Sequence, residues 1–260
     1  RSFPLGSPAT RLAAPRVLLG VAASLLLLSA CDTPKEGASA ATSASAVAAA
    51  PPPPPRPKTM PELLVDPEGP YLDGSRVNLA SPDGAERLKK KIGELPIEGK
   101  PVTLRADKKA KTTDVAAVVA ALGEAGAPKV TILTNGRDDV PKQIDVTPAS
   151  RVASPPPCSM TAMVLKDLST AIWPIQGAVA RQHKKGFAGP DLSHTGDTMK
   201  KHLASCDSSM AFFSGDDSLL WEMPYNLAGT LVTVDEKKRL DTLVLLPVSP
   251  TAGRAVALGK

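Results

Sequence analysis

The chain has 260 residues, enough for one large or two small domains. Hydrophobic residues make up 42% of it, aromatic residues 3%, and 27 residues are proline, which excludes a collagen-like chain, a polytopic membrane protein and a uniformly disordered one. The net charge is +5, but Arg1, Arg11 and Arg16 lie in a segment that looks removable, before the first acid, Asp32. Without these three, the chain has 28 basic and 26 acidic side chains. This near balance argues against nucleic acid as a partner.

Residues 1–31 have the pattern of a lipoprotein signal peptide. Arg11 and Arg16 precede an apolar run at 17–28, and the sequence LSAC follows at 28–31. Twelve residues of helix reach about 18 Å, well short of the ~30 Å hydrocarbon core of a bilayer, which disfavours a spanning helix. The LSAC ending resembles the lipobox of bacterial lipoproteins, which implies that Cys31 is lipidated. An ordinary signal peptide with an incidental cysteine is the alternative.

Residues 32–60 have the composition of a linker. They are rich in alanine and serine and include five consecutive prolines at 51–55. Such a sequence cannot bury apolar area, and its prolines favour an extended, semi-rigid chain. We expect it to hold a folded body away from a membrane of the bacterial cell envelope, on the periplasmic side.

Downstream of the linker, the chain alternates between the patterns of strands and helices. Strands are expected at 101–106 and 130–133. One helix is expected to begin with Ser81 as its cap, and a second with Thr113, ending at Gly126. Apolar residues recur at helical spacing in both: Leu88, Ile92 and Leu95 in the first helix, and Val115, Val118, Val119 and Leu122 in the second. The order of elements predicts an α/β fold, a small two-layer βαβ-type domain.

Two stretches in this region carry a family resemblance. LDGSRVNLASPDGAERLKKKIGEL at 72–95 and VTLRADKKAKTTDVAAVVAALGEAGAPKVTILTN at 102–135 resemble the periplasmic domain of ExbD/TolR proteins, the small partners in proton-driven envelope transport. The resemblance implies an ExbD/TolR-like domain over 61–148. Since the sequence carries no motif for catalysis or for a cofactor, we expect neither an enzyme nor a bound cofactor. The resemblance also implies an ExbB/TolQ-like partner and, since family members look like dimers, a homodimer. Asp107 stands where the family has an acid after the strand, and we expect it to serve as a turn or capping carboxylate.

One feature of the family is missing from the sequence upstream. ExbD/TolR proteins resemble one another in a membrane-spanning helix whose aspartate takes part in proton coupling. The apolar run at 17–28 contains no ionisable residue. An acid in the membrane is costly and marks function, so its absence predicts a protein that does not carry protons.

Residues 149–260 are expected to form a second α/β domain. A helix is predicted at 195–204, a strand at 210–214, a further helix at 218–229 that Pro224 kinks or shortens, and a strand at 243–246. Asp216 follows its strand as Asp107 follows the earlier one. A diverged repeat of the first domain is one interpretation. An unrelated extension that covers one face of the sheet is the other.

The remaining cysteines and histidines suggest little chemistry. Cys158 and Cys206 most simply form one disulfide in an exported protein. A zinc site at His202 and Cys206, with His194 one to two turns earlier, lacks a convincing fourth ligand. We therefore expect no metal, and no catalytic residues are assigned.

Together these patterns predict a lipid-anchored envelope protein, an accessory or docking component of energy-transducing biopolymer transport. The first alternative is a structural lipoprotein that binds peptidoglycan and is not coupled to a motor. The second is a secreted enzyme that uses the region of Asp216 or His194, which would require a cavity joining these residues.

Overall fold

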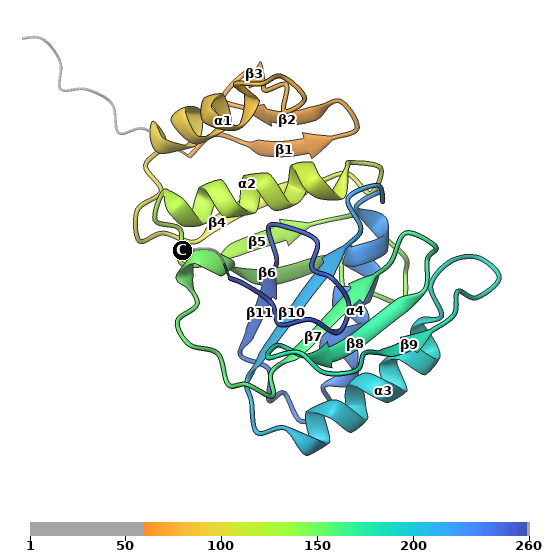
Figure 1. The fold of residues 1–260 in the computed structure, drawn as a ribbon. Helices are drawn as coiled ribbons and strands as arrows, with labels where there is room; N and C mark the ends of the chain where they lie inside the picture. Colours follow the sequence, from red (N-terminus) through yellow and green to blue (C-terminus); the bar gives the residue numbers. More distant parts are fainter. Residues whose placement is uncertain (1–59, 259–260) are drawn as a thin grey trace, which may run out of the picture. The chain divides into compact units, whose positions relative to one another are not determined.

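The structure, a computed structural model, describes residues 60–258, which belong to one compact unit. The predicted signal peptide, Cys31 and the linker up to residue 59 lie outside the described residues. Residues 60–148 are called the first half below, and residues 158–258 the second half (Figure 1).

Each half contributes strands and two helices. The first half contains β1 (Leu63–Asp66), β2 (Gly69–Leu72), β3 (Ser75–Arg76), α1 (Gly84–Gly93), β4 (Val102–Ala106), α2 (Thr112–Glu124), β5 (Val130–Leu133) and β6 (Gln143–Pro148). A short 3-10 turn (Ala149–Arg151) leads to the second half, which contains β7 (Met160–Val164), β8 (Thr170–Pro174), β9 (Arg181–His183), α3 (Leu192–Ser205), β10 (Met210–Gly215), α4 (Glu222–Val234) and β11 (Thr242–Leu245).

The strands of the described residues form one mixed sheet in the order β3-β2-β1-β4-β5-β6-β11-β10-β7-β8-β9. In the first half, β1 and β2 pair antiparallel, as do β2 and β3, whereas β1, β4 and β5 are parallel neighbours. Strand β6 runs antiparallel to β5 and parallel to β11. This last pairing makes the sheet continuous between the two halves.

The second half has the same connectivity. Strands β7 and β8 pair antiparallel, as do β8 and β9, and β7, β10 and β11 are parallel neighbours. Each half therefore follows the order β-β-β-α-β-α-β, with the same neighbours and the same relative strand directions. A different strand order in the second half would have excluded a repeat, and the described chain does not have one.

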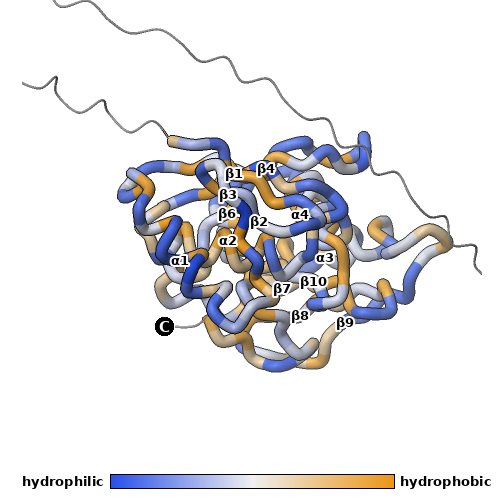
Figure 2. Tube along the Cα trace, turned by 90° about the horizontal axis from the view of Figure 1, so that it is seen from above, coloured by the Kyte–Doolittle hydropathy of each residue, from blue (hydrophilic) through white to orange (hydrophobic). Residues whose placement is uncertain are grey.

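The helices pack on one face of the sheet through their apolar sides. Leu88 and Ile92 of α1 are buried, and Lys89 and Lys90 lie exposed on the opposite side, as the sequence pattern predicts. In Figure 2, α1 is largely hydrophilic and β4 carries a hydrophobic stretch. A single cluster of buried side chains extends from β1 and α2 to β7, α3 and α4, so the two halves share their main core.

Two helix starts differ from the sequence-based prediction. Helix α1 begins at Gly84 with Asp83 at the N-cap, and Ser81 lies in the preceding turn, where its hydroxyl donates to the Asn78 carbonyl at 2.7 Å. A Cβ at position 84 would lie 2.3 Å from that carbonyl oxygen, so a glycine allows the helix to start against it. Helix α2 begins at Thr112, which places Thr113 inside it.

The ends of α2 and α4 test two further predictions. Gly126 has a φ of 106° and follows the last turn of α2, so the predicted glycine end is confirmed. The prediction for α4 was wrong in its bounds, because the helix covers Glu222–Val234 and not 218–229. Pro224 lies in its first turn, where a backbone N–H has no intrahelical acceptor, so the proline neither kinks nor shortens the helix.

Within residues 60–258, the outer face of the sheet, opposite the helices, is covered over the second half and not over the first. Residues 246–258, the C-terminal segment, run across it and are drawn in dark blue in front of β10 and β11 in Figure 1. The indole N–H of Trp173 donates to the Arg254 carbonyl at 2.9 Å, and the Val256 N–H donates to the Ile175 carbonyl at 2.9 Å. These contacts fix the segment on the sheet.

Candidate functional site

The acid after β4 forms a turn, as the sequence predicts. The Asp107 N–H donates to the Val65 carbonyl at the end of β1, at 2.8 Å. Its carboxylate accepts the Lys109 N–H at 2.7 Å, and its carbonyl accepts the Ala110 N–H at 2.9 Å. This is the hydrogen bonding of an aspartate that closes its own turn, so Asp107 connects a strand to a helix.

Asp216 has the same arrangement after β10. Its N–H donates to the Val164 carbonyl at the end of β7, at 2.9 Å. Its carboxylate accepts the Ser218 N–H at 3.0 Å and the Ser218 hydroxyl, and these bonds lower the pKa of Asp216. Its carbonyl accepts the Leu219 N–H at 3.0 Å. The carboxylate that a secreted enzyme would need is thus engaged in a turn.

The two aspartate turns contact each other. The Thr112 N–H donates to the Leu219 carbonyl at 3.1 Å, and the Trp221 N–H donates to the Ala110 carbonyl at 2.8 Å. Between these bonds, Lys111 and Leu220 form an isolated antiparallel bridge. The segments that lead into α2 and α4 are therefore paired directly by their backbones.

Helix α4 also binds the connection between β5 and β6. The indole N–H of Trp221 donates to the Thr134 hydroxyl at 2.9 Å inside the core, and the Tyr225 hydroxyl donates to the Pro141 carbonyl at 2.8 Å. Burial raises the pKa of Tyr225 to about 12. The first turns of α4 thus attach the second half to the first through buried polar bonds as well as apolar packing.

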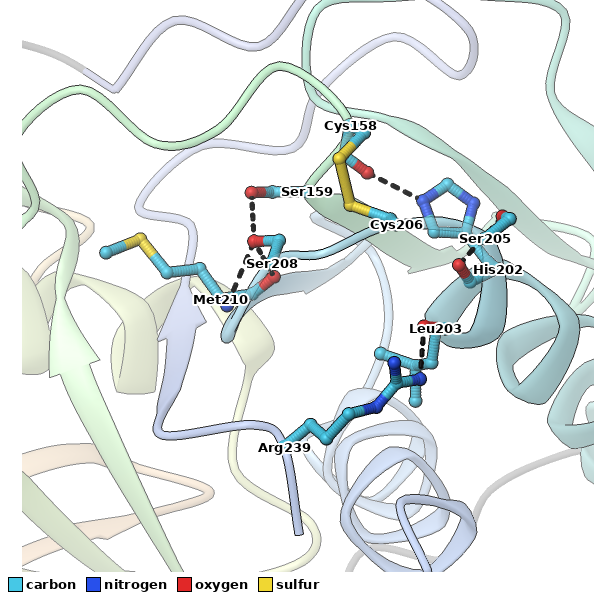
Figure 3. Close-up of a disulfide and its surroundings, with 9 residues drawn as sticks. All are labelled: Cys158, Ser159, His202, Leu203, Ser205, Cys206, Ser208, Met210 and Arg239. Carbon is cyan, nitrogen blue, oxygen red and sulfur yellow. Dashed lines mark hydrogen bonds between the residues drawn. A yellow bond between two sulfur atoms is a disulfide. The ribbon is translucent and has the colours of Figure 1, made fainter. Parts of the chain in front are cut away.

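The disulfide joins the two cysteines that the sequence pairs (Figure 3). Cys158 and Cys206 are linked, with their Cα atoms 5.7 Å apart. His202 Nε2 lies 2.8 Å from the Cys158 carbonyl oxygen, which can only accept a hydrogen bond, so this nitrogen is the donor. The pairing removes the Cys206 thiolate from the alternative zinc site, and His202 instead donates to the carbonyl of the disulfide-bonded Cys158.

The third residue of that alternative, His194, lies in the first turn of α3. Its Nδ1 is 2.7 Å from the Asp191 carboxylate, which also accepts the His194 N–H and so caps the helix. The carboxylate raises the pKa of His194 and the imidazole lowers that of Asp191. Within residues 60–258, no group of three or more histidine, cysteine, aspartate and glutamate side chains is arranged to hold a metal ion.

A cavity beside α3 bears on the enzyme alternative. It has a volume of about 760 Å³ and lies between the β5–β6 connection, the segment before α3 and the exposed side of α4. Asp191, Glu222 and Asn226 line it, but Asp216 and His194 do not. The two residues proposed for an enzyme are therefore not brought together in this cavity.

The geometry defines a small α/β domain with aspartate-closed turns at the carboxyl ends of two of its parallel strands, β4 and β10. Residues 24–136 match the family model described as "Biopolymer transport protein ExbD/TolR", so this part of the chain is similar to the ExbD/TolR family. The match covers β1 to β5 and both stretches that carry the resemblance, and it begins within the apolar run at 17–28. The family resemblance of the sequence is thus confirmed.

The other two comparisons add no relative. No curated protein matches the chain, and no solved structure matches it. Proteins of the ExbD/TolR family are envelope-associated, non-enzymatic components of biopolymer transport that work with ExbB/TolQ-type partners. Among residues 60–258, the structure contains no helix long and apolar enough to span a bilayer.

Proposed function

We propose that this protein is a lipid-anchored accessory or docking component of energy-transducing biopolymer transport. The observation that carries the proposal is the combination of an ExbD/TolR domain with an apolar run at 17–28 that contains no ionisable residue. A proton-coupling subunit needs a titratable group within the membrane. A domain without one contributes by binding its partners.

The chain between Cys31 and the folded part suits such a role. Residues 32–59 would span at most ~100 Å if fully extended at about 3.6 Å per residue. Acyl chains on Cys31, each contributing about 0.8 kcal/mol per buried CH₂, would hold the chain at the membrane. The domain would then reach a partner in the same membrane without leaving its anchor.

The anchor and the partner are tested by two measurements on the full chain. We expect Cys31→Ser to move the protein from the membrane fraction to the soluble fraction, whereas Cys206→Ser, which also removes a cysteine sulfur, leaves it in the membrane fraction. Continued membrane attachment of the Cys31→Ser protein would exclude the lipid anchor.

The second measurement is co-purification of the native protein from detergent-solubilised envelopes. Recovery of a polytopic ExbB/TolQ-like protein supports the transport role. Sedimentation with isolated cell wall, and no polytopic partner, would replace it by the peptidoglycan-binding lipoprotein.

A further inference from the structure

We propose that the second half is a second copy of the ExbD/TolR-type domain, and that the two copies are paired within one chain about a two-fold axis between Lys111 and Leu220. The proposal goes beyond the transport role and does not depend on the lipid anchor. In this arrangement the surface beside Lys111 binds the second half of the same chain.

The first argument is the connectivity. Seven elements follow one another in the same order in both halves, β1-β2-β3-α1-β4-α2-β5 and β7-β8-β9-α3-β10-α4-β11, with identical neighbours and strand directions. General rules of handedness and short connections narrow the choice of topologies but leave several for seven elements. Agreement at every step therefore favours a duplication over an unrelated extension.

The second argument is the agreement in register. In the first half Val65 is paired with Ala106, and the next residue, Asp107, donates to the Val65 carbonyl. In the second half Val164 is paired with Gly215, and the next residue, Asp216, donates to the Val164 carbonyl. Both aspartates then accept the N–H of the residue two positions on. Asp107 and Asp216 are thus corresponding residues.

The starts of the first helices agree as well. Helix α1 has Asp83 at its N-cap and helix α3 has Asp191, and each aspartate follows a proline. Each helix comes directly after the third strand of its half and leads into the strand that ends in the aspartate turn. The correspondence between the halves therefore includes the starts of α1 and α3 as well as the aspartate turns.

The third argument is the symmetry of the contact. Counted from Asp107 and Asp216, Ala110 corresponds to Leu219, Lys111 to Leu220, and Thr112 to Trp221. The Thr112 N–H donates to Leu219, and the Trp221 N–H donates to Ala110, so the two bonds exchange when the halves are exchanged. Lys111 is bridged to its own counterpart, Leu220. These two bonds and the bridge are arranged as a two-fold axis would place them. The Glu222 N–H also donates to the Lys108 carbonyl at 2.9 Å, a bond with no counterpart from Thr113, so the symmetry is exact only for the bonds beside the bridge.

The pairing has a consequence for assembly. Strand β6 lies between β5 and β11, so the inner edges of both halves are already hydrogen-bonded within the chain. The segments that follow the two aspartate turns are likewise hydrogen-bonded to each other within the chain. The family resemblance implies a homodimer, in which two chains supply the pair of domains. Here one chain would supply both domains, and it would not dimerise through this surface.

Engineered cysteines at the axis test the pairing in the full chain with Cys31→Ser. Lys111 and Leu220 are both exposed, and they form the type of antiparallel pair that makes no direct hydrogen bonds, with Cα atoms about 4.5 Å apart. This spacing falls within the range of a disulfide. Under mild oxidation we expect Lys111→Cys/Leu220→Cys to form a bond within one chain, read by mass spectrometry and non-reducing electrophoresis. The control pair, Lys109→Cys/Ser218→Cys, also joins nearby exposed positions but is out of register and should not bond.

The single variants distinguish one chain from two. If two chains paired through this surface, Lys111→Cys alone would place two thiols across the axis and give a covalent dimer. We expect it to remain at the mass of one chain, as should Leu220→Cys alone. Rapid dimer formation by either single variant, or a folded double variant that forms no bond within the chain, would overturn the proposal. Circular dichroism of each variant establishes that it is folded.

Discussion

The two halves share a connectivity but differ on the outer face of the sheet. Thr103 and Thr131 of the first half lie on this face and are at least partly exposed, whereas Phe212 and Val244, at the corresponding register positions, are fully buried. The first half therefore alternates apolar and polar residues, as a sheet with one solvated face does. The second half is buried on both faces of its strands, including the outward Thr161 and Ser214, because the C-terminal segment covers it.

The comparison teaches that connectivity and burial are set by different residues. The helix-facing positions, such as Leu104 and Phe213, are apolar in both halves and hold the shared core. The outward positions differ between the halves, and their polarity depends on whether another segment covers them. Among the described residues, nothing covers the outer face of the first half, so a partner that binds that face would contact one half of the chain and not the other.

The sharpest way to break this comparison is to truncate corresponding outward residues. We expect Phe212→Ala to lower the free energy of unfolding by about 3–5 kcal/mol, because it leaves a cavity between the sheet and the C-terminal segment. Thr103→Ala, on the solvated face, should change it by less than about 0.5 kcal/mol. Urea denaturation of the full chain with Cys31→Ser measures both. Equal losses would show that the two outer faces do not differ in burial.

The disulfide provides the next largest difference, since both of its cysteines lie in the second half. We expect Cys158→Ala/Cys206→Ala to cost about 2–4 kcal/mol, because the bond closes a long loop of the unfolded chain. Ser205→Ala, beside the disulfide but exposed, is the matched control. A loss confined to the second half, with the first half unfolding at its original urea concentration, would contradict a core shared by both halves.

The junction of the halves is probed by a smaller change. Tyr225→Phe removes the hydroxyl that donates to the Pro141 carbonyl and should cost about 1 kcal/mol. The native phenol should titrate only near pH 12, as followed by its ultraviolet absorbance. Ionisation of Tyr225 near the ordinary tyrosine pKa of about 10 would mean that α4 does not pack against the β5–β6 connection.

The smallest expected effect distinguishes the starts of α1 and α3. Asp191 raises the pKa of His194, so the stabilisation from this pair is complete below the ordinary histidine pKa of about 6.5 and is lost as the pH rises through the raised value. Helix α1 has Glu86 at the corresponding position, so it has no histidine–carboxylate pair there. An NMR titration of His194 measures the shift, and Asp191→Asn should abolish it. An ordinary pKa in the native chain would exclude the pair.

Local patterns in the sequence predict the central strands and helices of both halves. Strand β4, helix α2 and strand β5 have clear periodicity, and the turn at Asp107 follows from an acid placed directly after a strand. The apolar stretches of β10 and β11 are also recognisable, and the two cysteines of the second half suffice to suggest their pairing.

The features that sequence patterns miss depend on distant contacts. Strand β3 has two residues and takes its structure from pairing with β2. The start of α4 is set by the Trp221 N–H bonding to Ala110, more than a hundred residues away in the chain, and no local pattern indicates it. The C-terminal segment lacks strand or helix periodicity, so its position over Trp173 could not be predicted.

The pairing of the two halves is tested most directly by amide hydrogen exchange of Thr112 and Trp221, measured by NMR. Both N–H groups are buried at the axis and make the two reciprocal hydrogen bonds. The paired arrangement predicts that they exchange at similar, slow rates, close to those of the amides in β4 and β10, because opening either bond requires separating the halves. If either amide exchanged as fast as an exposed one while β4 and β10 stayed protected, the halves would not be joined about this axis.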